Sequence, residues 1–402
     1  MKTFLIICLC FVFCHPGYSQ RCYSVYSDYP GGNGLIEKIS GDTLYMRADL
    51  RDTEGDWFYW NFGVKNAAGR TLTFVFTRNN RFTDQGVAFS TDQGMSWQWL
   101  NSNAFITRTF SYTFPSNDEV RFSMSMPYTQ KNWENFITPL LSHPLVTPDV
   151  LCTTRKGRKV EMLYINKGAK NIQYRVIFTA RHHACEMMAN YVMEGIIRSL
   201  LTAPSLQWLR TRATFLFIPF VDKDGVEDGD QGKNRIPRDH NRDYSDSSIH
   251  METAALRKFL PEWEKGKPLI SFDLHCPYIY AAHDRDIYIV GSQIKENAME
   301  QEKYHALINS IIKKDTVNYK IGYLPFGILW NTGANNTRGR SFSLYSSEEL
   351  KSVLAVSFEF PYGSFSGIPV SREYYRLVGK HIAFALQQYL KDTKAPAKKK
   401  EL

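Results

Sequence analysis

The stretch Tyr174-Arg175-Val176-Ile177-Phe178-Thr179-Ala180 begins the part of the chain that decides the fold. Its β-branched, aromatic and other apolar residues are typical of a buried strand. Apolar residues then recur at helical spacing over 187–201, and short apolar runs return at 215–219, 269–274 and 353–358. Buried strands that alternate with helices predict an α/β domain with α/β/α layers and a mixed, largely parallel central sheet.

The region before this domain follows a different pattern. Apolar side chains alternate with period two over 45–126, as at Leu72 and Phe74, and breaks rich in Gly, Asn and Asp separate the runs. This pattern predicts a small antiparallel β-sandwich of roughly 100 residues. We therefore expect a supporting or docking sandwich over 20–126 and the α/β domain over 127–392.

Both ends of the chain carry patterns of their own. Lys2 followed by an apolar run over 4–13 is typical of a signal peptide, because the run is shorter than the ~20 residues that span a bilayer. We expect cleavage after Ser19, removal of residues 1–19 and export of the protein to a periplasm or the exterior. No later run is apolar for long enough to predict a membrane span in the mature chain. The lysine-rich stretch 393–402 is typical of a solvated tail.

Composition and charge narrow the functional classes. With 43% hydrophobic and 22% charged residues, the 402-residue chain has the composition of a folded globular protein. The net charge of +9 is modest, and no stripe of Lys and Arg is interleaved with aromatic residues, so a nucleic-acid partner is not expected. Four of the seven cysteines lie beyond the signal peptide, and their spacing alone leaves the pairing open: Cys22, Cys152, Cys185 and Cys276.

Ionisable residues stand just after, or at the end of, the predicted strands. His183 and Glu186 lie three residues apart between a strand and a helix, and His182 competes with His183 as a ligand. His275 ends another apolar run, where a buried imidazole needs a partner. Two imidazoles and a carboxylate on zinc leave a fourth tetrahedral position for water, as in catalytic sites. The alternative is that these are ordinary surface or packing residues.

Two further motifs carry charge. Glu359 lies among apolar residues, where a carboxylate needs a partner or has a raised pKa; the alternative is a buried ion pair with an arginine. Asp239-His240-Asn241-Arg242 lies in a polar loop. An arginine there can bind a substrate carboxylate through paired hydrogen bonds, and the alternative is a solvent-exposed network of salt bridges.

These motifs together resemble those of the zinc metallocarboxypeptidases of the funnelin type. The chain is most similar to the cytosolic-carboxypeptidase-like branch, whose members carry an N-terminal β-sandwich. Residues 180–186 match Ala-Arg-x-His-x-x-Glu, which favours His183 over His182 as the ligand. Residues 222–226 resemble Asn-Pro-Asp-Gly-Val, 239–242 resemble Asp-Leu-Asn-Arg, and 272–275 resemble the strand that bears the third ligand. Residues 56–59 and 127–129 resemble motifs of the branch's sandwich and of the junction after it.

The resemblance implies a role for each matching residue. One zinc ion per chain is expected on His183, Glu186 and His275. Glu359 is implied as the general base, and Asp239 as the acceptor that orients His183. The resemblance also implies residues that contact the substrate: Asn241 and Arg242 for its C-terminal carboxylate, Arg235 for the oxyanion with Arg238 as a competitor, Tyr345 as a mobile tyrosine, and Arg338 and Arg340 for acidic C-terminal side chains.

The resemblance further implies the reaction. We expect a metallocarboxypeptidase that hydrolyses the last peptide bond of a peptide or protein with a free α-carboxylate. One alternative is a peptidase acting on cell-wall stem peptides with the same metal site. Another is a module that binds C-termini without turnover, although such a module needs neither a base nor an open position on zinc.

A disulfide follows from the implied ligand set. Cys185 precedes the ligand Glu186, and Cys276 follows the ligand His275. Two ligands of one zinc lie close together because each bond is only ~2.0–2.2 Å long. In an exported protein, neighbouring thiols at suitable distance oxidise. We therefore predict a Cys185–Cys276 disulfide; the alternatives are two small buried residues whose thiols never meet, or direct zinc ligation.

Overall fold

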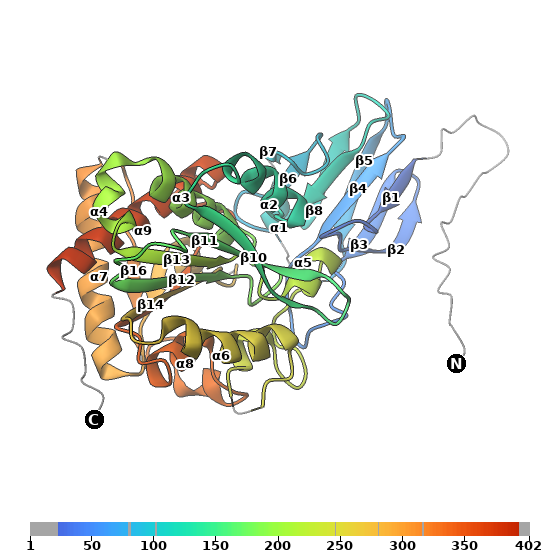
Figure 1. Ribbon diagram of the computed structural model, residues 1–402. Helices are drawn as coiled ribbons and strands as arrows, with labels where there is room; N and C mark the ends of the chain where they lie inside the picture. Colours follow the sequence, from blue (N-terminus) through green and yellow to red (C-terminus); the bar gives the residue numbers. More distant parts are fainter. Residues whose placement is uncertain are drawn as a thin grey trace.

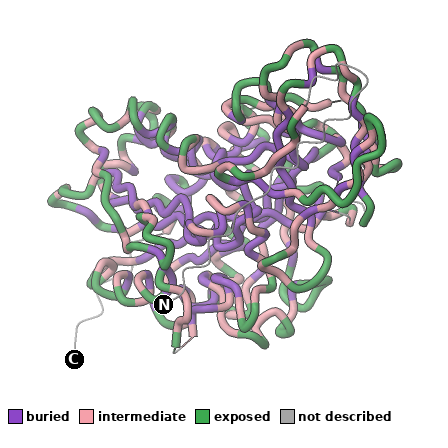
Figure 2. Tube along the Cα trace, turned by 90° about the vertical axis from the view of Figure 1, so that its right-hand side faces the viewer, coloured by how far each residue is buried: buried purple, intermediate pink, exposed green. Residues whose placement is uncertain are grey.

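The computed structural model describes residues 23–78, 82–100, 103–245, 247–279, 281–315 and 317–393. The predicted signal peptide, Cys22 and the predicted tail from residue 394 onward lie outside these ranges. Figure 1 shows a mainly β part, coloured blue to teal, that packs against one side of a larger α/β part. In both parts the buried residues lie in the interior and the exposed residues lie on the outer loops and helix faces, as Figure 2 shows.

The mainly β part contains two sheets, with strand orders β1-β4-β9-β6-β7 and β2-β3-β5-β8. Aromatic side chains join the two sheets: the ring of Phe74 on β5 lies 5.2 Å from that of Phe62 and 5.5 Å from that of Phe122. The strands are β1 (Ser24–Tyr26), β2 (Leu35–Ser40), β3 (Thr43–Arg47), β4 (Asn61–Lys65), β5 (Thr71–Phe76), β6 (Val87–Ser90), β7 (Gln98–Leu100), β8 (Thr109–Thr113) and β9 (Val120–Ser123).

One strand pair departs from the predicted antiparallel pattern. β3 and β5 pair in parallel, whereas the other pairs in these two sheets are antiparallel. The chain passes through β4, in the opposite sheet, between β3 and β5. It therefore re-enters the first sheet in the same direction as it left. Side chains alternate between the two faces of a strand whether its neighbour runs parallel or antiparallel, so the alternation in the sequence does not distinguish the two kinds of pairing.

The α/β part is built on an eight-stranded sheet of order β10-β11-β13-β12-β14-β17-β15-β16. The pairs β12–β13, β12–β14, β14–β17 and β15–β16 are parallel, and the others are antiparallel, so the predicted mixed, largely parallel sheet is confirmed. Its strands are β10 (Val146–Thr153), β11 (Lys159–Ile165), β12 (Tyr174–Ala180), β13 (Ala213–Ile218), β14 (Leu269–His275), β15 (Tyr288–Val290), β16 (Gly322–Leu324) and β17 (Leu354–Glu359). A separate hairpin pairs β18 (Ser364–Phe365) with β19 (Ile368–Pro369).

Helices cover both faces of this sheet (Figure 1). Val176 and Phe178 of β12 belong to the core shared with α3, α7 and α9, whereas Ile177 between them belongs to the core shared with α6 and α8. This is the alternation expected of a strand buried on both faces. The helices are α1 (Ala104–Thr107), α2 (Gln130–Ile137), α3 (Met188–Thr202), α4 (Gln207–Arg210), α5 (Lys223–Asp228), α6 (Met251–Glu264), α7 (Lys295–Lys314), α8 (Phe342–Glu348) and α9 (Arg372–Asp392).

The parallel strands bring the chemical motifs to one edge of the sheet. The pairing register sets Ala180 of β12 beside Leu274 of β14, and His275 of β14 beside Glu359 of β17. Parallel strands end at the same edge, where open α/β sheets bind their ligands. Motifs that are far apart in the sequence therefore meet at the carboxyl ends of β12, β14 and β17.

Candidate metal centre and active site

The loop between β12 and α3, which carries two of the predicted metal ligands, is fixed by a buried arginine. Arg181 has a φ of 62° where the strand turns into the loop. Its guanidinium donates to the carbonyl oxygens of Ala184 (2.9 Å) and Tyr128 (2.8 Å) and to Oδ1 of Asn190 (2.9 Å). The loop is thus tied to itself, to α3 and to the segment that enters the α/β part.

The segment 230–235 connects the same loop to the sandwich. The carbonyl of Gln231 accepts a hydrogen bond from the loop backbone (3.0 Å), and its side chain bonds both the N–H and the carbonyl of Tyr59 (2.8 Å each). At Gly232, with a φ of 74°, a Cβ would lie only 2.1 Å from the nitrogen of Ala184. A glycine is required there because the two backbones lie so close together.

His183, Glu186 and His275 converge at the ends of β12 and β14. Nδ1 of His183 lies 2.9 Å from Oε1 of Glu186, and Nδ1 of His275 lies 2.7 Å from Oε2. The candidate ligand atoms lie within 4.8 Å of one another, and all three residues are buried. Burial opposes ionisation of Glu186, but its electrostatic interactions with His183, Lys233 and His275 outweigh burial and hold its pKa well below the ordinary value. These donors suit a zinc ion with one position left open.

The second nitrogen of each histidine faces a carboxylate. Nε2 of His275 lies 2.7 Å from Oδ2 of Asp273, and Nε2 of His183 lies 3.6 Å from Oδ1 of Asp239. A carboxylate on one ring nitrogen fixes the tautomer and leaves the other nitrogen free for a metal. Asp239 lies where the motif implies. Asp273 is a partner that the motifs do not identify, although its place two residues before His275 puts both side chains on one face of β14.

His182, the competing ligand, lies behind the site. Its Nδ1 is 2.8 Å from Oδ1 of Asp273, and its Nε2 is 2.7 Å from the hydroxyl of Tyr244. The ring is fully buried and does not line the cavity described below. His183 lines that cavity and His182 does not, so His183 is the better placed of the two histidines to bind a metal that a substrate can reach.

Glu359 is a buried carboxylate at the end of β17. It is 7% exposed, and its Oε2 has no hydrogen-bond partner among the described residues. Burial raises the pKa of Glu359 above its ordinary value, and the negative charge of Glu186 adds to this effect. A carboxylate that holds a proton more readily than usual suits acid–base work near neutral pH.

A cavity of about 540 Å³ opens over these residues, and Asn241 and Arg242 form part of its wall. The amide of Asn241 is fixed, because its Oδ1 accepts from the N–H of Phe342 (3.0 Å) and its Nδ2 lies 3.3 Å from Nε2 of His275. Nη1 of Arg242 donates to the carbonyl of Asn241 (2.8 Å). The guanidinium keeps further N–H donors that can bind an anion in the cavity.

Arg235 and Arg238, the two arginines predicted to contact the oxyanion of the substrate, lie outside the cavity wall. Arg235 is surrounded by three carboxylates: Nε is 3.1 Å from Asp52, Nη2 is 2.9 Å from Asp230, and Nη1 donates to Asp222. Nε of Arg238 donates to Oδ1 of Asp243 (2.6 Å). Neither arginine lines the cavity. The guanidinium of Arg235 thus lies in an ion cluster that joins the sandwich to the α/β part, and not at the cavity wall where the predicted oxyanion role would place it.

Three other candidates also lie away from the cavity wall. Tyr345 on α8 stacks on Tyr244, with ring centroids 5.5 Å apart, and lines a separate small cleft. Arg340 donates to Glu349 (2.6 Å), and Arg338 lies 3.4 Å from Glu54 at the surface. Tyr345, Arg338 and Arg340 therefore do not line the cavity in which their predicted contacts with the substrate would be made.

Comparison with known proteins agrees with this geometry. Residues 141–265 match the family model described as zinc carboxypeptidase. The matched segment contains His183, Glu186, Asn241 and Arg242. Over this segment, the chain is similar to zinc carboxypeptidases. His275 and Glu359 lie beyond the matched segment, and the pairing of β14 with β12 and β17 brings them to it.

Proteins similar to this chain include cytosolic carboxypeptidases. The chain is 27% identical to cytosolic carboxypeptidase 6 of Caenorhabditis elegans over 282 residues, which cover 62% of this chain and 61% of that protein. It is 26% identical to human cytosolic carboxypeptidase 1 over 249 residues, which cover 56% of this chain and 19% of the human protein. The chain therefore spans less than two thirds of either relative.

Solved structures share the fold of this chain. A metallo-carboxypeptidase from Burkholderia cenocepacia superposes with a TM-score of 0.73 at 18% identity, covering 92% of this chain and 99% of that one. A metallo-carboxypeptidase from Pseudomonas aeruginosa gives the same TM-score and identity over 92% of this chain. Both matches span the sandwich as well as the α/β part. Within the described ranges, no helix combines the length and the apolar character needed to cross a bilayer.

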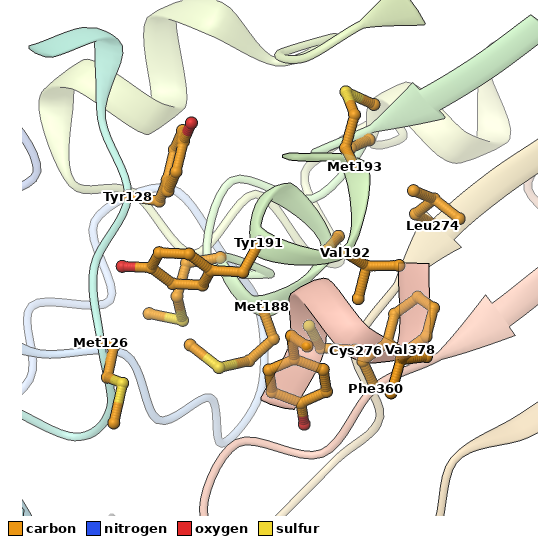
Figure 3. Packing of buried hydrophobic residues seen from close by; sticks show 14 of the residues in the cluster. Met126, Tyr128, Met188, Tyr191, Val192, Met193, Leu274, Cys276, Phe360 and Val378 are labelled. Atoms are coloured by element: carbon orange, nitrogen blue, oxygen red, sulfur yellow. The ribbon is translucent and has the colours of Figure 1, made fainter. Parts of the chain in front are cut away.

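The predicted Cys185–Cys276 disulfide is wrong, because both cysteines are free and buried. Figure 3 shows Cys276 in the apolar core beside Phe360 and Val378. Successive side chains of a strand point to opposite faces, so a histidine that faces the cavity sends the next residue into the core. Burial raises the pKa of Cys185 to about 12 and that of Cys276 well above its ordinary value, which disfavours the thiolate form that reacts.

Proposed function

We propose that this protein is a zinc-dependent metallocarboxypeptidase that removes the last residue of peptides or proteins with a free α-carboxylate. The observation that carries the proposal is the juxtaposition, at one cavity, of the His183, Glu186 and His275 donors with Glu359 and Arg242. The donors supply a metal site, the carboxylate supplies a base and the guanidinium supplies an anchor for an anion. The match of residues 141–265 to the zinc carboxypeptidase family model supports the same function.

The donor set fits one zinc ion. Nδ1 of His183 and Nδ1 of His275 flank the two oxygens of Glu186, and their opposite nitrogens are turned toward Asp239 and Asp273. A zinc ion held by these residues would lower the pKa of a bound water molecule and would polarise the carbonyl to be attacked. Asp239 and Asp273 keep the two imidazoles in the tautomer that leaves Nδ1 free.

Glu359 moves the proton. Its unpartnered Oε2 accepts a proton from the attacking water, and the raised pKa lets the carboxyl group hold that proton briefly. The O–C bond to the carbonyl carbon forms as the water loses its proton. When the C–N bond breaks, Glu359 returns the proton to the leaving nitrogen. No net proton is gained or lost by the protein in one cycle.

Arg242 selects the end of the chain. Its guanidinium pairs with the carboxylate of the last residue, and the fixed amide of Asn241 lies beside it. A paired arginine–carboxylate contact fixes both position and orientation. A substrate held by its C-terminal carboxylate presents the last peptide bond to the metal centre, which gives an exopeptidase rather than an endopeptidase.

A C-terminal peptide library tests this function. The mature protein is incubated with free-acid peptides and with the same peptides carrying a C-terminal amide, and products are identified by mass spectrometry. We expect loss of one C-terminal residue from the free acids, inhibition by a chelator and recovery with Zn²⁺. Internal cuts, or equal cleavage of the amides, would contradict the proposal; binding without cleavage would favour the C-terminus-binding module.

We also propose that the protein is exported, on the strength of Lys2 and the apolar run that follows it. N-terminal sequencing of the protein recovered from the exterior or the periplasm should begin at Gln20. Recovery from the cytoplasm with the first residues intact would reject export and leave the proposed activity unaffected.

A further inference from the structure

Two residues with a permanent positive charge, Lys233 and Arg242, lie among the described residues that line the cavity. Peptide hydrolysis needs positive charge at two places: at the substrate's carboxylate and at the carbonyl oxygen, which becomes negative in the transition state. In the proposed function, Arg242 binds the C-terminal carboxylate of the substrate. Since Arg235 and Arg238 are held by carboxylates outside the wall, Lys233 is the remaining cation for the carbonyl oxygen.

Lys233 reaches the centre of the site from the segment that links the sandwich to the metal-ligand loop. Its ammonium lies 2.5 Å from Oε1 of Glu186 and 3.5 Å from the carbonyl of Cys276. It also stands over the ring of Trp57, 5.1 Å from the centroid. The side chain is only 13% exposed, so its charge acts where little water screens it.

The contact with Glu186 is compatible with a second role. Without a metal, Lys233 neutralises the carboxylate of Glu186. If Glu186 held a metal ion, the ion would neutralise part of the charge of the carboxylate, and the ammonium of Lys233 would be freer to contact another anionic group. Lys233 then remains at the cavity wall, beside the metal centre and on the same wall as the base Glu359.

Resting on the proposed function, we propose that Lys233 is the catalytic residue that stabilises the oxyanion of the scissile carbonyl, in place of an arginine. The ammonium contacts the carbonyl oxygen as the water attacks the carbon and negative charge moves onto that oxygen. It releases the oxygen when the C–N bond breaks and the charge returns to the carbon–oxygen double bond. Lys233 forms no covalent bond and transfers no proton, so the proton balance described for Glu359 is unchanged.

The competing role for Lys233 is that of a structural counter-ion of Glu186, and Lys233→Met separates the two. Removal of one oxyanion donor lowers kcat by ~10²–10³, so we expect a fall of that size with KM changed by only a few-fold and zinc content unchanged by elemental analysis. Lys233→Arg should recover part of the lost kcat. A loss of zinc that accounts for the lost activity, or an unchanged kcat, overturns the proposal.

A matched control addresses the arginine that the motifs suggest. Arg235→Lys keeps a positive charge among Asp52, Asp222 and Asp230 and should leave kcat within a few-fold of the wild type. A fall of ~10² in kcat, in a folded and zinc-loaded Arg235→Lys protein, would return the oxyanion to Arg235.

A binding measurement keeps this inference separate from the proposed function. A peptide whose scissile carbonyl is replaced by a phosphinate carries tetrahedral, negatively charged oxygens like those of the transition state. By calorimetry, Lys233→Met should weaken its binding by ~10²–10³ and weaken binding of the free-acid product by only a few-fold. Equal binding of the phosphinate to both proteins rejects the role of Lys233. Absence of any cleavage by the wild type rejects the proposed function instead.

Discussion

The sandwich and the edge of the α/β sheet bury different kinds of side chain. Between residues 23 and 126, the buried polar side chains that the structure describes are uncharged, and the core is a cluster of aromatic rings around Trp60. The ends of β12, β14 and β17 instead bury His183, Glu186, His275 and Glu359. Apolar burial stabilises a fold directly, whereas buried charges cost free energy unless they are paired or bind a metal. The sandwich core therefore mainly stabilises the fold, whereas the ends of β12, β14 and β17 hold ionisable side chains that are available for chemistry.

The metal ligands give the largest expected contrast between the two regions. His275→Ala removes one of three ligands, so we expect loss of most of the zinc and of all measurable peptidase activity. Elemental analysis after dialysis measures the metal. His182→Gln is the matched control, since the Nδ1 and Nε2 of His182 already face Asp273 and Tyr244 and the metal should stay. Full zinc content in His275→Ala would reject this ligand.

The base is expected to affect rate without affecting the metal. Glu359→Gln keeps the shape of the side chain and removes the proton acceptor. Kinetics with a free-acid peptide should show kcat lower by ~10²–10⁴, with zinc content unchanged. Unchanged turnover would mean that another carboxylate moves the proton.

A substitution in the sandwich core should lower the stability of the fold without changing the metal content or the substrate binding of the folded protein. Trp60→Ala leaves a cavity among Phe76, Phe82 and Phe110 and is expected to lower the free energy of unfolding by ~3–5 kcal/mol. Denaturant titration measures the loss, and zinc content and KM should be unchanged where the variant is folded. Ile39→Ala, at a side chain that is 50% exposed, should change stability by less than ~0.5 kcal/mol. Loss of zinc from folded Trp60→Ala would show that the two regions are coupled.

The carboxylate anchor gives the smallest of these effects and the sharpest internal control. Arg242→Ala should lower kcat/KM for a free-acid peptide by ~2–5 kcal/mol of transition-state stabilisation, because a paired charge is lost. On the amidated peptide, wild type and variant should be equally poor, since the partner of the guanidinium is absent. A similar loss on both substrates would indicate that Arg242 acts through the structure of the loop.

The same two regions show which structural features local sequence patterns can predict. Apolar periodicity predicted both parts, because one buried face per strand or helix is a local property of the chain. It did not predict the parallel pairing of β3 with β5, which depends on the route through β4 in the other sheet. The order of the motifs placed His183, Glu186, His275 and Glu359 in one family pattern, and parallel strand ends brought them to one edge.

The sequence by itself determined the fold class, the resemblance to zinc carboxypeptidases and the set of groups available for chemistry. Only the tertiary structure decided which cation of the segment 233–238 faces the cavity. Lys233 reaches Glu186, whereas Arg235 is bound by Asp52, which is 183 positions away in the sequence. The fold also decided that Cys276 enters the core instead of a disulfide. Such outcomes depend on long-range ion pairs and on the face of the strand from which a side chain leaves, and spacing along the chain encodes neither of them.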